Sequence, residues 1–126
     1  MEEVKPKYFT PKEANKTLPL VKKIVEDILN NAKQIKYYVE TLGQEAENNV
    51  IVLALAEEIN SYMNELEEIG CSYKDWSFEL GLVDFPSVID NKEVLLCWRS
   101  DEDSIKYYHG LFEGFIGRKL IPDEYL

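Results

Sequence analysis

Most side chains that can carry out chemistry lie in one stretch of the chain, residues 80–118. They are Asp84, Cys97, Trp98, Arg99, His109, Glu113 and Arg118. His109 is the only histidine, and an imidazole titrates near neutral pH and is a common metal ligand. The set matches no known spacing for a nucleophile, a phosphate-binding loop or a zinc finger. No reaction therefore follows from these residues alone.

Acid–base or metal-dependent chemistry is one interpretation of this stretch, centred on His109, Asp84 and Arg99. Glu113 is a further candidate metal ligand, four residues after His109. That spacing places both on one face only in a helix, and the glycines at 110 and 114 disfavour a helix. Cys97 can add a sulfur ligand. A divalent metal is the one cofactor that these side chains suggest, and their spacing matches no known ligand pattern.

The competing interpretation is structural or binding. A single histidine at the end of an apolar strand is typical of a core residue with satisfied hydrogen bonds, so the sequence favours that role for His109. Asp84 and Arg99 can form a salt bridge across neighbouring strands. As a binding site, the region would present Trp98, Arg99, His109 and Arg118 to a ligand.

Composition predicts one globular domain. The chain has 126 residues, of which 45% are hydrophobic and 30% are charged, within the globular range. The first residues, MEEVKPK, lack the apolar core of a signal peptide, and no run approaches the roughly 18 apolar residues of a membrane span. A cytoplasmic location and free thiols at Cys71 and Cys97 are therefore predicted.

The charge of the chain is strongly acidic and uneven. The net charge of −10 argues against binding to nucleic acid or to an anionic membrane. Residues 1–42 carry eight lysines and six acidic residues, whereas residues 43–126 carry six basic and eighteen acidic residues. Such an excess of acidic residues is typical of a surface that keeps a protein soluble rather than of a site that binds a cation.

Two helices are predicted to position the reactive stretch. Thr10-Pro11-Lys12-Glu13 is typical of a helix start, and Pro19 predicts a break between a short helix over 11–16 and a longer one capped by Thr17. Apolar residues then recur every three or four positions in two seams. The seams are Leu18, Val21, Val25, Ile28, Ala32, Ile35, Val39 and Leu42, and Val52, Leu55, Ile59, Tyr62, Leu66 and Ile69. They predict an antiparallel hairpin over 11–70 that ends at Gly70.

Three antiparallel strands are predicted to follow, over 82–88, 93–99 and 104–109, and then a glycine-rich turn to 118 and a tail over 119–126. A two-residue turn at Asp90-Asn91 places Asp84 opposite Cys97, and the next connection places Lys106 opposite Cys97. His109 then falls on the face that meets the helices. Pro86 favours an edge strand, which makes 93–99 the central one.

The blocks YFTPKEANKTLP, GLVDFPS, EVLLCWR and YYHGLFEGFIGR occur in this order around the long helical pair. Together they resemble the domain-of-unknown-function 2203 family of small bacterial and archaeal proteins. The resemblance covers most of the chain. It implies a whole family member and brings no activity, and it does not include the position of Glu113.

The predicted fold is α+β, with a long antiparallel helical hairpin followed by a three-stranded antiparallel meander. Two alternative functions are expected for it. The first is an interaction module that forms a coiled-coil homodimer through its helices, because a short sheet cannot cover a hairpin about 37 Å long. Its pocket would lie near Trp98, Arg99 and His109. The second is a small metal-dependent or acid–base enzyme, of hydrolase type, centred on His109, Asp84 and Arg99.

Overall fold

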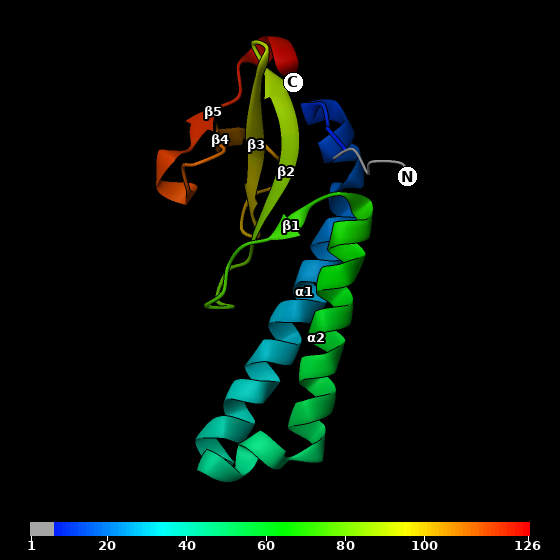
Figure 1. Cartoon of the computed structure of the whole chain (residues 1–126), viewed down its shortest axis with the longest axis vertical. Helices are drawn as coiled ribbons and strands as arrows, with labels where there is room; N and C mark the ends of the chain where they lie inside the picture. The colour runs from blue at the N-terminus through cyan, green and yellow to red at the C-terminus, as the bar shows by residue number, and fades with distance from the viewer. Residues whose placement is uncertain (1–6) are drawn as a thin grey trace, which may run out of the picture.

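The computed structural model describes residues 7–126. The fold is α+β, with two packed helices followed by a five-stranded antiparallel sheet of order β1-β2-β3-β4-β5 (Figure 1). The elements are α1 Pro11–Leu42, α2 Val50–Ile69, β1 Ser72–Tyr73, β2 Leu82–Ile89, β3 Lys92–Arg99, β4 Tyr107–Gly110 and β5 Lys119–Leu120. Among the described residues, no helix is long and apolar enough to cross a membrane.

Helix α1 begins as predicted but does not break. Thr10 and Glu13 form the expected capping box, and Pro11 occupies the first turn. The prediction of a separate short helix was wrong, because α1 runs through Pro19 as one helix of 32 residues. Pro19 lies on the exposed face, where water can satisfy the carbonyl that loses its hydrogen bond. Thr17 caps nothing and instead donates its hydroxyl to the carbonyl of Ala14 at 2.7 Å.

The predicted hairpin is confirmed. Ile28 and Leu66 are fully buried at the seam, and Asn31 donates its side-chain amide to the carbonyl of Leu55 at 3.3 Å. A 3-10 helix over Gly43–Asn48 turns the chain. Gly70 ends α2 with φ of 114°, a left-handed conformation that glycine adopts without strain.

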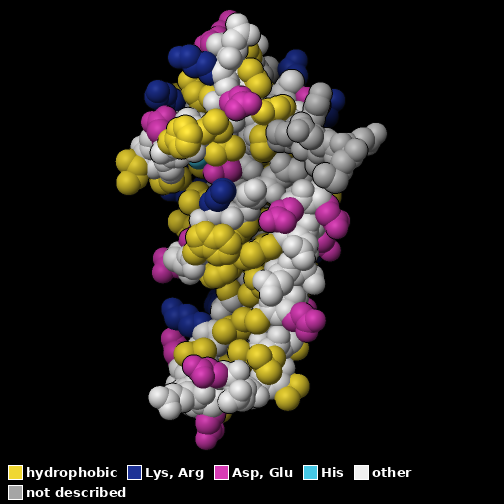
Figure 2. Space-filling view, in the orientation of Figure 1, with side chains coloured by type: hydrophobic (Ala, Val, Ile, Leu, Met, Phe, Trp, Pro, Cys, Tyr) yellow, Lys and Arg dark blue, Asp and Glu magenta, His cyan; other side chains and the backbone are white. Residues whose placement is uncertain are grey.

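The far half of the hairpin extends beyond the sheet (Figure 1). Apolar side chains continue along it in the space-filling view (Figure 2). Several are about half exposed, including Val39 at 49%, Ile51 at 50% and Leu53 at 54%. This part of the hairpin therefore presents apolar surface that the sheet does not cover.

The sheet has five strands instead of the predicted three. The two extra strands, β1 and β5, have two residues each, too short to leave an alternating pattern. The central position of β3 is confirmed. So is the turn at Asp90 and Asn91, whose φ values of 54° and 63° suit a two-residue hairpin. The prediction that Pro86 marks an edge strand was wrong, because β1 pairs with β2 at Val83 and Asp84. Pro86 lies beyond this pairing, and its carbonyl accepts a hydrogen bond from the amide of Phe9 at 2.7 Å.

The register between β3 and β4 differs by one residue from the prediction. Asp84 lies opposite Cys97 as expected, but Tyr107, not Lys106, is the other partner of Cys97. The loop after β3 is longer because Glu102 holds it, with its side chain accepting from the amide of Arg99 at 2.8 Å. The shift moves His109 to the opposite face of the sheet.

One face of the sheet packs on α1 and forms the core. It contributes Val83, Phe85, Val94, Leu96 and Trp98, each 6% exposed or less. Because side chains alternate along a strand, Asp84 and Cys97 point to the other face. The predicted placement of His109 on the helix-facing side was therefore wrong.

Candidate functional site

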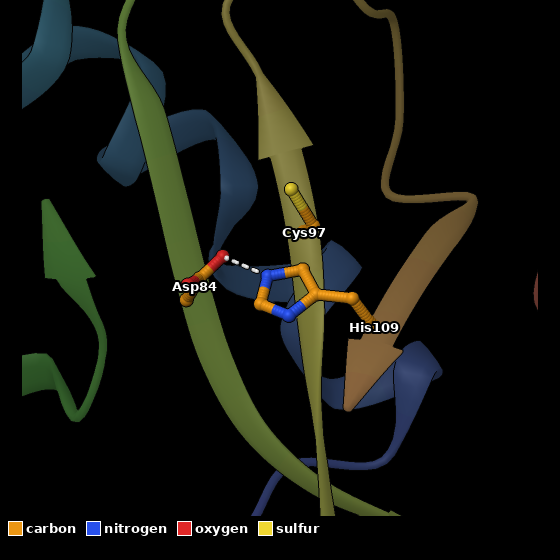
Figure 3. Close-up of side chains that lie close together, drawn as sticks. All are labelled: Asp84, Cys97 and His109. Carbon is orange, nitrogen blue, oxygen red and sulfur yellow. Dashed lines mark hydrogen bonds and ion pairs between the residues drawn. The ribbon is translucent and has the colours of Figure 1, made fainter. Parts of the chain in front are cut away.

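Three neighbouring strands bring Asp84, Cys97 and His109 together on the sheet face that points away from the helices (Figure 3). Their side-chain ligand atoms all lie within 4.8 Å of one another. The residues are 6%, 1% and 3% exposed. Among residues 7–126 they form the one cluster of three or more His, Cys, Asp or Glu side chains close enough to share a metal ion.

Both ring nitrogens of His109 have a partner. Nδ1 lies 2.9 Å from the carbonyl oxygen of Gly110, and Nε2 lies 3.2 Å from Oδ1 of Asp84. The Gly110 oxygen can only accept, so Nδ1 carries a hydrogen and donates it. Nε2 then faces Oδ1 of Asp84, and this contact is a hydrogen bond when either atom carries a hydrogen.

Burial governs the protonation of Asp84 and Cys97. Burial raises the pKa of Asp84, and the opposing effects of His109 and Lys74 do not cancel it. Burial and then the charge of Asp84 raise the pKa of Cys97 to about 12, against the influence of Arg118. Without a metal, Cys97 is therefore a neutral thiol at physiological pH.

These contacts argue against Cys97 as a nucleophile. A cysteine nucleophile is activated by an adjacent base, most often a histidine nitrogen, or by surroundings that lower the pKa of the thiol. Here the two nitrogens of His109 contact Gly110 and Asp84 instead, and the pKa of the thiol is raised rather than lowered.

The cluster lines a cavity of about 270 Å³. The other lining residues are Lys74, Leu82, Leu95, Leu111, Glu113, Gly114 and Phe115. They come from the segment after β1, from β2 and β3, and from the glycine-rich segment after β4. A small molecule that enters this cavity would meet the three buried side chains together.

The spacing of the cluster fits a metal of the zinc class. In a tetrahedral zinc site, nitrogen and oxygen ligands about 2.0–2.1 Å from the metal lie about 3.3–3.4 Å from each other. Nε2 of His109 and Oδ1 of Asp84 lie 3.2 Å apart. The sulfur of Cys97, within 4.8 Å of both ligand atoms, needs a separation of about 3.5–3.6 Å. A movement of about 1 Å by one side chain completes the set.

The other predicted site residues lie elsewhere. Trp98 is 1% exposed in the core and donates its indole hydrogen to the carbonyl of Glu102 at 2.9 Å. Arg99 does not pair with Asp84, because its Nε lies 2.5 Å from Oδ1 of Asp101. Neither residue lines the cavity beside His109.

Glu113 and Arg118 organise the glycine-rich segment. Glu113 accepts the amide hydrogen of Gly110 at 3.0 Å, so it holds the turn that also positions the carbonyl bound by His109. Arg118 donates to Glu102 at 2.8 Å and lies over the rings of Tyr107 and Phe115, 4.0 and 4.2 Å from their centroids. Both residues support the site, and neither takes part in the three-residue cluster.

The sequence interpretation named Asp84 and His109 as candidates and Cys97 as a sulfur ligand, but it placed His109 on the opposite face of the sheet from the other two. The missing information was the register of β4, which depends on the seven-residue segment 100–106. Glu102 determines the shape of that loop, but in the sequence it is only one of several acidic residues in a turn-forming run. Nothing in the local sequence predicts that its side chain would bond to the backbone.

The fold and the site define a small α+β domain with a buried carboxylate, thiol and imidazole on one face of its sheet. The family model described as uncharacterized conserved protein, DUF2203, matches residues 7–121. The chain belongs to this family, as the order of its sequence blocks predicted. None of the curated proteins and none of the solved structures compared with the chain matches it.

Proposed function

We propose that the chain binds a divalent transition metal of the zinc class through Asp84, Cys97 and His109. The observation that carries the proposal is the convergence of an oxygen, a sulfur and a nitrogen donor within 4.8 Å. Zinc uses these three donor types in proteins. The hydrogen bond from Nδ1 of His109 to the Gly110 carbonyl supports it, because metal-binding histidines usually donate their second ring hydrogen in this way.

The protonation of the cluster is consistent with metal uptake. Burial raises the pKa values of Asp84 and Cys97, and a metal ion would displace the protons of the carboxyl and the thiol. The resulting carboxylate and thiolate together offset the charge of a divalent cation. Affinity should therefore fall as the pH is lowered, because each ligand must lose its proton to bind.

Three protein ligands leave one tetrahedral position open, and the cavity beside the cluster provides access to it. Structural zinc sites are closed by four protein ligands, whereas catalytic sites keep one position for water or substrate. The arrangement therefore supports metal-assisted hydrolysis, with a metal-bound water as the attacking group. Lys74 lines the same cavity and would favour an anionic substrate.

Metal analysis tests this proposal directly. We expect purified protein to take up about one zinc ion per chain, with affinity measured by competition against a coloured chelator. Cys97→Ser and His109→Asn should each lower the affinity at least about tenfold. Cys71→Ser is the matched control, since Cys71 is equally buried but lies outside the cluster. Equal affinities in all four proteins would refute the proposal.

We also propose that the hairpin self-associates, as the sequence analysis expects. The supporting observation is the uncovered apolar surface on its far half, where Val39, Ile51 and Leu53 are about half exposed. Helix α1 carries lysines at 33 and 36, whereas no lysine occurs from residue 45 to residue 70, which contain seven acidic residues. Antiparallel association would place α1 of one copy against α2 of the other, with favourable charge contacts.

A further inference from the structure

A second groove, larger than the cavity beside His109, lies at the sheet end of the hairpin, away from its far half. It has a volume of about 690 Å³ and is lined by the first turns of α1, the segment before β4 and the C-terminal segment. Its lining residues are Lys12, Asn15, Lys16, Ser104, Ile105, Lys106, Leu120, Ile121, Asp123 and Leu126. No residue is shared with the cavity beside His109.

The apolar part of the groove is open to solvent. Ile105 and Ile121 are 0% and 3% exposed, whereas Leu120 and Leu126 are 66% and 44% exposed. Two large leucines therefore extend a buried apolar surface into water. Covering them with an apolar chain is favourable, because it removes apolar surface from water.

Three lysines border this apolar surface, namely Lys12, Lys16 and Lys106. Within residues 7–126 none of the three forms an ion pair with an acidic side chain. Asp123 is the one acid among the lining residues. In a chain of net charge −10, a group of three such lysines around an apolar groove is a local reversal of charge that would attract an anion.

The walls of the groove are joined by hydrogen bonds, so its shape does not depend on a ligand. Asn15 donates its side-chain amide to the carbonyl of Ile105 at 3.2 Å and accepts from the amide of Ile105 at 2.8 Å. The amide of Ile121 donates to the carbonyl of Lys106 at 2.8 Å. These contacts tie α1, the segment before β4 and the C-terminal segment together. Largely preformed sites of this size are typical for small molecules.

We infer that this groove binds a small anionic amphiphile, namely a carboxylate that carries an unbranched apolar chain. The chain lies along the exposed Leu120 and Leu126, above the buried Ile105 and Ile121, and the carboxylate is held by the surrounding lysines. A purely apolar ligand leaves the lysines without a counter-ion, and a small anion without a chain leaves the leucines exposed. The inference does not depend on metal at Asp84, Cys97 and His109.

Calorimetric titration with sodium decanoate, below its micelle-forming concentration, tests the inference on the full chain. We expect saturable binding of about one decanoate per chain. Decyltrimethylammonium, which has the same chain and the opposite charge, should bind at least about tenfold more weakly, and acetate should not bind measurably. Equal affinity for the two decyl ligands would overturn the inference, as would the absence of decanoate binding.

Two variants locate the site. Replacing Lys12, Lys16 and Lys106 together by glutamine should weaken decanoate binding about tenfold, because each exposed charge contact contributes only modestly to affinity. Leu120→Asp should abolish it. Lys36→Gln, on the far half of the hairpin, is the control and should leave the affinity unchanged, with melting curves to verify folding. Unchanged decanoate binding in the triple variant would contradict the inference. So would an unsubstituted dimer that does not bind decanoate and that Leu120→Asp dissociates, because the groove would then be a contact between two copies of the chain.

Discussion

Asp84 on β2 and His109 on β4 meet across β3, with Oδ1 and Nε2 3.2 Å apart although the residues are 25 positions apart in sequence. Because Nδ1 of His109 donates to Gly110, Nε2 is the ring nitrogen that faces Asp84. This contact joins two strands of the metal-free protein, and it also brings together two of the three proposed metal ligands.

Asp84→Asn separates the contribution of Asp84 to stability from its contribution to metal binding. In metal-free protein the asparagine amide can donate to Nε2, so the buried nitrogen keeps a hydrogen-bond partner and the substitution leaves no buried charge uncompensated. We therefore expect an unchanged or higher melting temperature in the presence of a chelator. Zinc at about 100 times its dissociation constant should stabilise the unsubstituted protein by about 2.7 kcal/mol and should not stabilise the variant. A variant that is strongly destabilised without metal would show that the pair is mainly structural.

Ile28→Ala tests the helical seam. Ile28 is 0% exposed, so the substitution should lower the free energy of unfolding by about 2–4 kcal/mol. Val39→Ala, on the same helix but at a position 49% exposed, should cost less than about 1 kcal/mol. Denaturant titration measures both values. A near-zero change at Ile28 would be inconsistent with a buried seam.

Asp75 should give the protein an acid-labile contribution to stability. Its carboxylate accepts hydrogen bonds from the Ser77 hydroxyl and from the amides of Ser77, Glu79, Leu80 and Gly81. Burial raises the pKa of Asp75, but these hydrogen bonds outweigh it and lower the pKa to about 2. A lowered pKa stabilises the fold above the unfolded value, 3.8, and this contribution is lost as the pH falls towards 2.

The corresponding substitution is Asp75→Asn, with thermal melts recorded between pH 7 and about pH 2. The variant should melt at a lower temperature at pH 7, and the difference should shrink below about pH 4. Asp103→Asn is the control, since the exposed Asp103 side chain makes no hydrogen bond in the described part of the chain. A constant difference at every pH would count against a role for the charge of Asp75.

Self-association of the hairpin is testable by sedimentation at micromolar concentration. We expect a dimer, and we expect Ile51→Glu combined with Leu53→Glu to shift it to monomer, because both side chains are about half exposed on the far half of the hairpin. Lys22→Glu, near the sheet end of α1, is the control. A monomeric unsubstituted protein would contradict this proposal without affecting the metal site.

Periodicity predicted the helical hairpin well because a seam of three- and four-residue steps specifies a helix and its buried face. It did not predict the continuity of α1 through Pro19, since the cost of a proline depends on whether its position faces solvent. That orientation becomes known only once the sheet is placed against the helix.

The positions of the candidate site residues likewise depend on contacts that periodicity does not reveal. The pairing of Asp84 with Cys97 followed from the two-residue turn at Asp90 and Asn91, whose geometry restricts the register. The position of His109 followed from a longer loop, where Glu102 hydrogen-bonds to the backbone of Arg99. A difference of one residue in that loop moves His109 from one face of the sheet to the other. Side-chain contacts that hold an irregular loop leave no periodic signal.

The central claim is that Asp84, Cys97 and His109 hold one metal ion, and spectroscopy of the cobalt-substituted protein tests it most directly. Cobalt(II) occupies zinc sites, and a cysteine ligand gives a thiolate-to-metal absorption band in the near ultraviolet. We expect this band to saturate at about one cobalt per chain, to disappear in Cys97→Ser and to persist in Cys71→Ser. No band in the unsubstituted protein, or a band that survives in Cys97→Ser, would contradict the account.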